Sequence, residues 1–159
     1  MTIEWVQADL REFVRPASFD IAVNMYTSFG YCKTVEEDAL IICNIAQSLK
    51  KGGCFILEMV GREIAVRDFT AGEWFERAGY IVLTDFTVEG AWEGLRSHWQ
   101  LYTKDGLKAD HTFVQRLYAA TELRQLMLSA GFTSVEIYGD FDRPPYNERA
   151  RTMILVGRK

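Results

Sequence analysis

A chain of 159 residues is the size of one ordinary domain, and its 48% apolar and 13% aromatic content excludes a disordered or low-complexity protein. The 18 basic and 22 acidic residues give a net charge of -4 without a cluster of Lys and Arg, which argues against nucleic acid as a partner. No segment has the form of a signal peptide or the apolar length of a membrane span, so we expect a cytoplasmic protein that does not bind membranes.

The cysteines predict packing rather than chemistry. Cys32, Cys43 and Cys54 are odd in number, have no Cys-x-x-Cys spacing and lie on or beside apolar segments. The two histidines, His98 and His111, are distant from them in sequence. We therefore expect reduced thiols and no metal site.

The first elements in chain order are two short strands. Residues 3–9 alternate weakly between apolar and polar side chains, which predicts a strand with Asp9 at its carboxyl end. Residues 20–25 are almost uniformly apolar, as in a strand that is covered on both faces of a parallel sheet.

A helix and a third strand follow. Thr34 and Glu37 have the spacing of a capping box, and Gly52 stands where a left-handed helix cap is expected. Between them an apolar stripe recurs at spacings of four and three residues: Val35, Ala39, Ile42, Ala46 and Leu49. An apolar run then reaches Glu58, so residues 20–58 predict a βαβ crossover.

The middle of the chain has a different pattern. Residues 61–79 are looser, with a possible short helix over 70–77, and residues 80–89, 95–103 and 107–118 predict an antiparallel meander. A two-residue turn at Asp105 and Gly106 would connect the last two strands. With that turn, one face would carry Leu95, Trp99, Leu101, Val114 and Arg116, and the other His98, Gln100, His111 and Phe113.

The last elements are a helix and a strand pair. The helix begins at Thr121 and ends at Gly131, and its apolar stripe is Leu123, Leu126, Met127 and Ala130. Strands are predicted over 135–138 and 152–156. We find no linker or repeat, so residues 1–159 are expected to form a single domain with a lid at approximately 61–118.

Several of these segments together resemble a known family. In order they are Ala8–Arg11, Asn24–Tyr31, Leu49–Gly53, Arg116–Tyr118, Ala130–Phe132 and Arg151–Lys159. Their order and separation resemble the C-terminal two thirds of the class I, Rossmann-like S-adenosylmethionine-dependent methyltransferases. The resemblance implies an α/β fold: a partial, mixed and mostly parallel sheet with an antiparallel last strand, and the meander as a β-sheet lid.

The resemblance also implies a cofactor site for S-adenosylmethionine. Asp9 would accept a hydrogen bond from the adenine amine with Leu10 beside it, and Asn24, Met25 and Tyr26 would line the methionine half. The alternatives are an Asp9 that caps the next turn and ordinary polar residues at a strand end.

Other residues are candidates for the methyl acceptor, which would be a small molecule. They are Tyr31, Trp74, Arg116 and Tyr118 as substrate residues, with Tyr31 and His98 as catalytic candidates. The alternatives are aromatic core packing, an exposed or packing histidine, and an Arg116 that pairs with Asp110 or Glu122.

One part of the family pattern is missing, because the twelve glycines include no Gly-x-Gly motif and eight residues precede Asp9. The chain is therefore expected to be either a truncated methyltransferase or a natural remnant that serves as an interaction or ligand-binding domain. An unrelated α+β ligand-binding module is a third possibility. By this resemblance the domain lacks the family's first two strands, which would leave the edges of the remaining strands unpaired and predicts a homo-oligomer or strand exchange.

Overall fold

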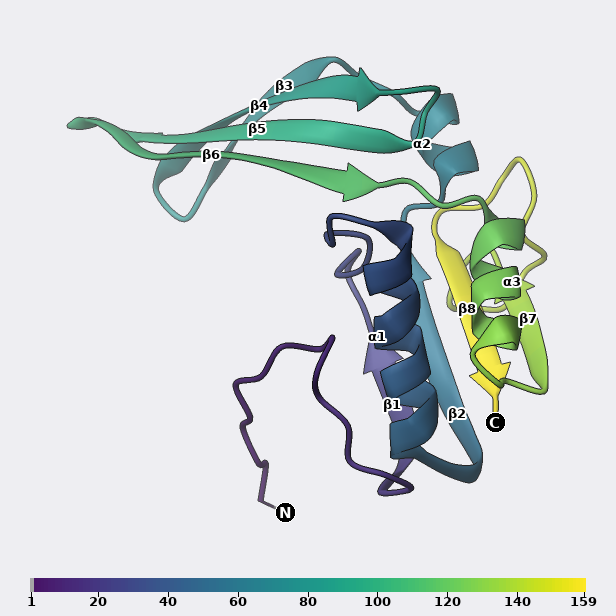
Figure 1. The fold of residues 1–159 in the computed structure, drawn as a ribbon. Helices are drawn as coiled ribbons and strands as arrows, with labels where there is room; N and C mark the ends of the chain where they lie inside the picture. The colour runs from purple at the N-terminus through teal and green to yellow at the C-terminus, as the bar shows by residue number, and fades with distance from the viewer. Residues whose placement is uncertain (1) are drawn as a thin grey trace.

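The computed structural model describes residues 2–159 and folds them into two four-stranded sheets (Figure 1). Sheet A has the order β1-β2-β8-β7, formed by Phe19–Asn24, Leu49–Met59, Met153–Arg158 and Ser134–Tyr138. Sheet B has the order β3-β4-β5-β6, formed by Gly72–Arg77, Tyr80–Glu89, Gly94–Thr103 and Gly106–Arg116. The helices are α1 (Val35–Ser48), α2 (Arg62–Arg67) and α3 (Ala120–Ser129).

The predicted βαβ unit is confirmed. β1 and β2 pair in parallel, with Asn24 opposite Leu57 at their carboxyl ends, and α1 connects them. The capping box of α1 is present, since Thr34 Oγ1 accepts from Glu37 N–H at 3.3 Å. The predicted cap at Gly52 is wrong, because α1 already ends at Ser48 with Leu49 in extended conformation. Gly52 is left-handed, with φ 79°, inside the irregular start of β2.

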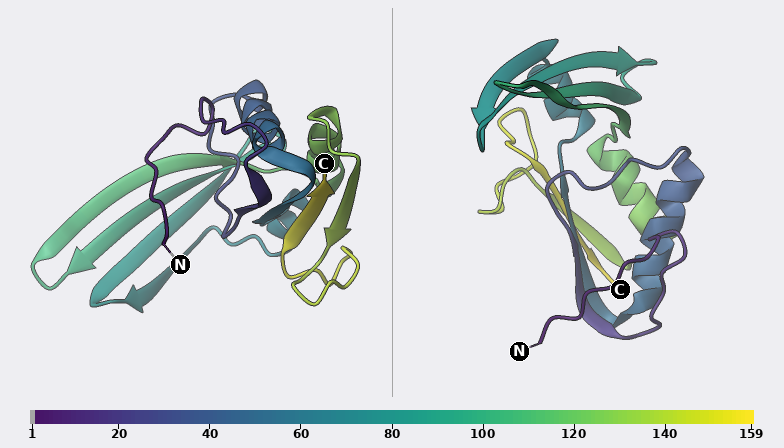
Figure 2. Two further views of the ribbon diagram at one scale, coloured as in Figure 1. Left: turned by 90° about the horizontal axis from the view of Figure 1, so that it is seen from below. Right: turned by 90° about the vertical axis from the view of Figure 1, so that its left-hand side faces the viewer.

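Sheet A has the mixed pattern that was expected. β8 is antiparallel to both β2 and β7, so β1, β2 and β7 run in one direction and β8 runs against them. Helices α1 and α3 cover one face of sheet A (Figure 2). The hydrophobic core lies between these helices and the sheet and includes Phe55, Leu57 and Leu155. The opposite face leaves Ile21 61% and Val23 62% exposed, so the expectation that β1 is covered on both faces is wrong: the helices cover one face only.

The N-terminal strand prediction is wrong. Residues 3–9 form no strand and run as an extended segment along the α/β body, because no strand of residues 2–159 lies beside them to pair with. The strand that was predicted over residues 3–9 is therefore absent from sheet A among the described residues.

Sheet B confirms the meander and corrects two details. Residues 72–77 form strand β3 instead of a helix, because they pair with β4 along their whole length. Helix α2 lies earlier, over Arg62–Arg67. The last turn is centred on Lys104 and Asp105, since Thr103 pairs with Gly106.

The shifted turn and a bulge after Leu101 also change the predicted faces. Trp99 lies opposite His111, and His98 lies opposite Thr112. The inner face of sheet B, which turns toward sheet A, therefore carries Trp99, His111 and Phe113. The outer face carries His98 and Gln100, both bonded to Asp110.

Three features of the described residues bear on the expectations about membranes, metals and cysteines. Residues 2–159 contain no helix that is long and apolar enough to cross a membrane. Within the same range, no three His, Cys, Asp or Glu side chains are grouped as a metal site. The cysteines are free, and burial raises the pKa of the Cys32 thiol to about 11.

Candidate functional site

The loop after β1 lies where the carboxyl ends of the two parallel strands meet. Tyr26 and Thr27 are both left-handed, with φ 56° and 55°, a conformation that is unfavourable for a β-branched residue. Ser28 Oγ donates to Met25 O at 2.6 Å and closes the turn. Open α/β sheets bind ligands at this edge, so the loop is the first candidate site.

Sheet B fixes the other side of this loop. The Gln115 amide donates to Thr27 O at 3.4 Å and to Phe29 O at 3.1 Å, and Arg116 N–H donates to Gly30 O at 2.7 Å. Gly30 has φ 92°, and a Cβ there would lie 2.8 Å from Arg116 O. Only glycine permits this approach of the loop to the end of β6.

Two of the predicted cofactor residues lie together. Leu10 and Asn24 line a cavity of about 150 Å³ between the N-terminal segment, β1 and α1. Asn24 Oδ1 is buried there and has no hydrogen-bond partner among the described residues. A buried acceptor without a donor is costly, and a ligand donor would satisfy it. Met25 follows in the loop, and Tyr26 is 91% exposed beyond it.

Asp9 lies at the start of a turn, as in the alternative in which it caps that turn. Its Oδ1 accepts from Arg11 N–H at 2.9 Å, and its carboxylate pairs with the Arg11 guanidinium at 2.6 Å. These bonds lower the pKa of Asp9 to about 2. Its role toward a cofactor stays a prediction.

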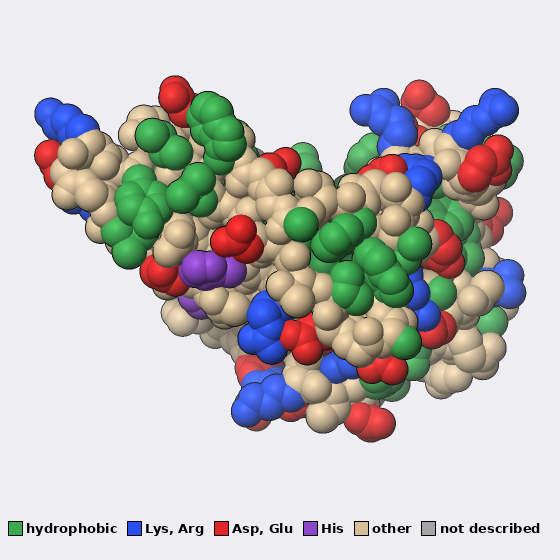
Figure 3. All heavy atoms as spheres, turned by 90° about the horizontal axis from the view of Figure 1, so that it is seen from above, with side chains coloured by type: hydrophobic (Ala, Val, Ile, Leu, Met, Phe, Trp, Pro, Cys, Tyr) green, Lys and Arg blue, Asp and Glu red, His purple; other side chains and the backbone are tan. Residues whose placement is uncertain are grey.

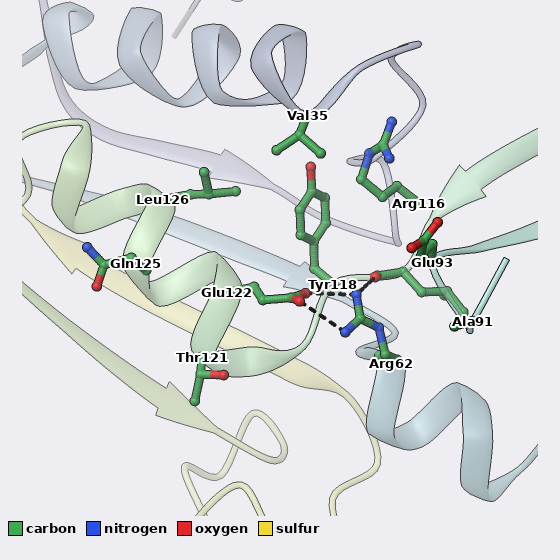
Figure 4. A pocket seen from close by; sticks show the side chains of 11 residues that line it. Val35, Arg62, Ala91, Glu93, Arg116, Tyr118, Thr121, Glu122, Gln125 and Leu126 are labelled. Atoms are coloured by element: carbon green, nitrogen blue, oxygen red, sulfur yellow. Dashed lines mark hydrogen bonds and ion pairs between the residues drawn. The ribbon is translucent and has the colours of Figure 1, made fainter.

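A larger cleft lies between α1, α3 and the end of sheet B (Figure 4). Its volume is about 820 Å³, within the range of roughly 300 to 1,000 Å³ that small-molecule sites occupy. Arg116 and Tyr118 lie on its wall and meet at Asp38 of α1, which is fully buried. Tyr118 Oη donates to Asp38 Oδ2 at 2.8 Å, and Arg116 Nε donates to the same oxygen at 3.2 Å. Arg116 therefore pairs with neither Asp110 nor Glu122.

The remaining charges of the cleft differ in their partners. Arg62 pairs with Glu122 at 2.9 Å and donates to Leu117 O at 2.8 Å. Glu93 lines the same cleft, and its carboxylate has no ion-pair or hydrogen-bond partner among residues 2–159. The cleft thus offers one free negative charge.

A neighbouring cavity of about 410 Å³ brings Tyr31 to the same residues, because Glu93 and Arg116 line both spaces. Tyr31 packs on Phe113 of the inner face of sheet B, with ring centroids 5.8 Å apart. Burial raises the pKa of its phenol. The rings of Phe113, Trp99 and Phe75 continue along this face at 6.5 and 6.3 Å.

Two predicted residues lie elsewhere. Trp74 is 67% exposed, and both it and His98 lie on the outer face of sheet B. His98 Nε2 is 2.9 Å from Asp110 Oδ1, and its Nδ1 is 3.6 Å from Asp85. Figure 3 shows histidine beside acidic side chains on this face, next to a hydrophobic group. The geometry does not bring these residues to the loop or the cleft.

Two residues of the cleft, Asp38 and Glu93, were not predicted from the sequence. Asp38 lies between Val35 and Ile42 on the apolar stripe of α1, so a charge within a buried stripe was the available signal. Glu93 follows a Gly-Ala-Trp turn with no local pattern, and only the pairing of β5 with β6 places it at the cleft.

Comparisons with known proteins agree with this architecture, although no family model matches the chain. A cypemycin N-terminal methyltransferase of a Streptomyces species is 25% identical over 174 residues, covering 97% of this chain and 64% of the relative. A dTDP-3-amino-3,4,6-trideoxy-alpha-D-glucopyranose N,N-dimethyltransferase of Streptomyces venezuelae is 36% identical over 52 residues, covering 33% of this chain and 22% of the relative.

Solved structures are similar over almost the whole chain. The CcbJ methyltransferase of Streptomyces caelestis has a TM-score of 0.80 at 16% identity, covering 96% of this chain and 62% of that one. An S-adenosylmethionine-dependent methyltransferase of Clostridium acetobutylicum has a TM-score of 0.79 at 12% identity, covering 96% and 63%. The chain spans less than two thirds of the length of these proteins. It has the fold of the class I, Rossmann-like S-adenosylmethionine-dependent methyltransferases.

Proposed function

We propose that this chain takes part in the transfer of a methyl group from S-adenosylmethionine to an amine of a small molecule. The observation that carries the proposal is the pairing of β1 with β2 and the constrained loop at their carboxyl ends, in a chain with a methyltransferase fold. The two relatives suggest a nitrogen acceptor, since one is an N-terminal methyltransferase and the other an N,N-dimethyltransferase.

The residues at the loop fit one part of the cofactor. Asn24 has an unpartnered buried oxygen, and Leu10, Met25 and Tyr26 lie beside it in sequence or in space. The cavity of about 150 Å³ is smaller than a complete small-molecule site, so these residues would hold one portion of the ligand. Asp9 is proposed as the adenine partner, in competition with Arg11. The bound cofactor supplies a methyl group on a sulfonium.

The larger cleft is proposed to hold the acceptor beneath sheet B, which would act as a lid. Glu93 offers its free carboxylate to the acceptor nitrogen, where it can take the proton that an ammonium must lose before its lone pair attacks the methyl group. Arg116 is held by Asp38 on the same wall. Tyr31 supports the acceptor side with a phenol that packs on Phe113 and can exchange a hydrogen bond with the acceptor. No protein nucleophile is needed, since orientation of the acceptor is the main task of the protein. His98 has no part in this proposal.

Calorimetric titration with S-adenosylhomocysteine tests the cofactor half. We expect the chain to bind with a dissociation constant below about 1 mM, and Asn24→Ala to weaken binding by about tenfold. His98→Gln, on the outer face of sheet B, is the matched control and should bind like the wild type. A folded chain that does not bind would contradict the proposal.

Mass spectrometry of methylated products tests the acceptor half, with an amino sugar, a peptide with a free N-terminal amine and their hydroxyl analogues as acceptors. We expect methylation of an amine and a raised KM for it in Glu93→Gln. Cofactor binding without transfer to any acceptor would favour the alternative, a non-catalytic ligand-binding domain.

A further inference from the structure

We infer that Glu58 is a positioning residue that holds the loop after β1 in its strained form and so sets the affinity of the proposed cofactor site. The inference rests on the proposed function but concerns a residue outside the predicted site. Glu58 is the second-last residue of β2 and is 9% exposed. One of its carboxylate oxygens, Oε2, accepts from Tyr26 N–H at 2.6 Å.

The other carboxylate oxygen is also occupied. Thr152 Oγ1 donates to Glu58 Oε1 in a short hydrogen bond, and the same hydroxyl lies 3.2 Å from Met59 O. Thr152 directly precedes β8, which pairs with β2. The carboxylate therefore connects the strands of sheet A to the backbone of the loop, and both of its oxygens accept.

The loop needs this contact because its conformation is unfavourable by itself. Tyr26 and Thr27 are consecutive left-handed residues with side chains that disfavour positive φ. Such a backbone persists only where its surroundings hold it, and such positions gather at ligand sites. Thr27 N–H also donates to Glu58 O at 3.3 Å, so both left-handed residues are bonded to one residue of β2.

The chemistry of the contact distinguishes two substitutions. In Glu58→Gln the amide oxygen can still accept from Tyr26 N–H, while its NH₂ donates to Thr152 Oγ1 and the threonine proton turns to Met59 O. Glu58→Leu keeps the bulk but leaves the Tyr26 N–H without an acceptor. Only the leucine variant should release the loop.

The experiment measures two quantities on the full chain. Hydrogen exchange of the Tyr26 amide reports the contact without any ligand, and titration with S-adenosylhomocysteine reports the site. We expect Glu58→Leu to speed the exchange and to weaken binding by about tenfold or more, and Glu58→Gln to stay within about threefold of the wild type in both.

A second substitution separates positioning from general stability. Thr27→Gly added to Glu58→Leu should recover part of the lost affinity, because glycine adopts the left-handed conformation freely. Ile137→Ala on β7 is the control: it removes core packing away from the loop, so it should lower the melting temperature without changing affinity.

Each outcome decides a separate point. Unchanged Tyr26 exchange in Glu58→Leu overturns the contact itself. Faster exchange with unchanged affinity overturns the positioning role and leaves the proposed function standing. A wild-type chain that binds no S-adenosylhomocysteine removes the proposed function together with the role of Glu58 in it, while the exchange result still decides the contact.

Discussion

At the scale of single residues, Asp38 joins helix α1 to the end of sheet B. It is fully buried and receives hydrogen bonds from Arg116 and Tyr118. We expect Asp38→Asn to lower the free energy of unfolding by about 3 kcal/mol, because the guanidinium would keep its charge in a largely buried place without a counter-charge. Tyr118→Phe should lower the free energy of unfolding by only about 1 kcal/mol, because it removes one hydrogen bond to Asp38. Urea unfolding measures both, and equal losses would contradict the ion pair as the dominant interaction.

Tyr118 also gives a prediction for alkaline pH. Burial, with help from Asp38, raises the pKa of its phenol well above the ordinary value of about 10. Because the folded state holds the proton more tightly than the unfolded state, this contribution to stability is complete below about pH 10 and is lost as the pH rises toward the folded pKa.

Stability should therefore fall less steeply above pH 10 in Tyr118→Phe than in the wild type. Urea titrations at a series of alkaline pH values measure the slope, with Tyr26→Phe as a control at an exposed tyrosine. Burial also raises the pKa of Tyr146, so some slope should remain. Identical slopes in the wild type and Tyr118→Phe would contradict the prediction.

Residue identities alone indicated part of the candidate site. Arg116 and Tyr118 were named as acceptor residues because a guanidinium and an aromatic ring suit such a site, and the structure brings them to one cleft. Their partner Asp38 was missed because the helical stripe was assigned from apolar residues only. Glu58 was missed for a related reason, since a carboxylate at a strand end is commonly exposed and only tertiary contacts show this one to be buried.

At the scale of elements, the capping box fixes the start of α1. Thr34 and Glu37 exchange hydrogen bonds, and Glu37 also pairs with Arg11 at 2.7 Å. We expect Thr34→Ala to lower the free energy of unfolding by about 1 kcal/mol, since the cap loses its acceptor. Thr121→Ala, at an exposed position in the first turn of α3, should change it by less than about 0.5 kcal/mol. Chemical denaturation measures the free energy of unfolding of both variants. Equal losses would rule out the cap as the cause of the loss in Thr34→Ala.

Elements were predictable where the local pattern and the tertiary partner agree. The strand at 20–25, the capped helix after Thr34 and the meander strands all formed, although β1 is covered on one face and not on both. Two segments differed from the prediction: residues 3–9 were predicted as a strand and form none, and residues 72–77 were predicted as a helix and form β3. Strand formation depends on a neighbouring strand that a sequence pattern does not reveal. The predicted register of β6 was also wrong. A bulge between Leu101 and Tyr102 offsets the pairs of β5 and β6 beyond it from the two pairs next to the turn, and the sequence does not reveal such a bulge.

At the scale of the whole molecule, the cleft exists only where sheet A and sheet B meet. Its walls come from α1, α2, α3, the turn between β4 and β5 and the end of β6, which are far apart in the sequence. The two sheets lie apart as separate ribbons (Figure 2), and the hydrogen bonds from Gln115 and Arg116 to the loop after β1 connect them. No window of the sequence contains such a site, so its shape could not be predicted locally.

Sheet A also presents an open edge. β1 lies at the end of the strand order, and no strand within residues 2–159 pairs with its outer side. Ile21 and Val23 add exposed apolar side chains on the uncovered face next to it. Such an edge is a template for another strand, so we predict concentration-dependent self-association of the chain.

Sedimentation velocity at increasing concentration measures this association. Ile21→Lys combined with Val23→Lys should weaken the association by about tenfold or more, because charge on an edge strand opposes pairing and reduces the apolar area that two copies can share. Leu107→Lys on sheet B is the matched control, at a side chain that is 48% exposed, and should leave the association unchanged. A monomer at every concentration would contradict pairing along β1, and an equal effect of the control would move the contact to sheet B.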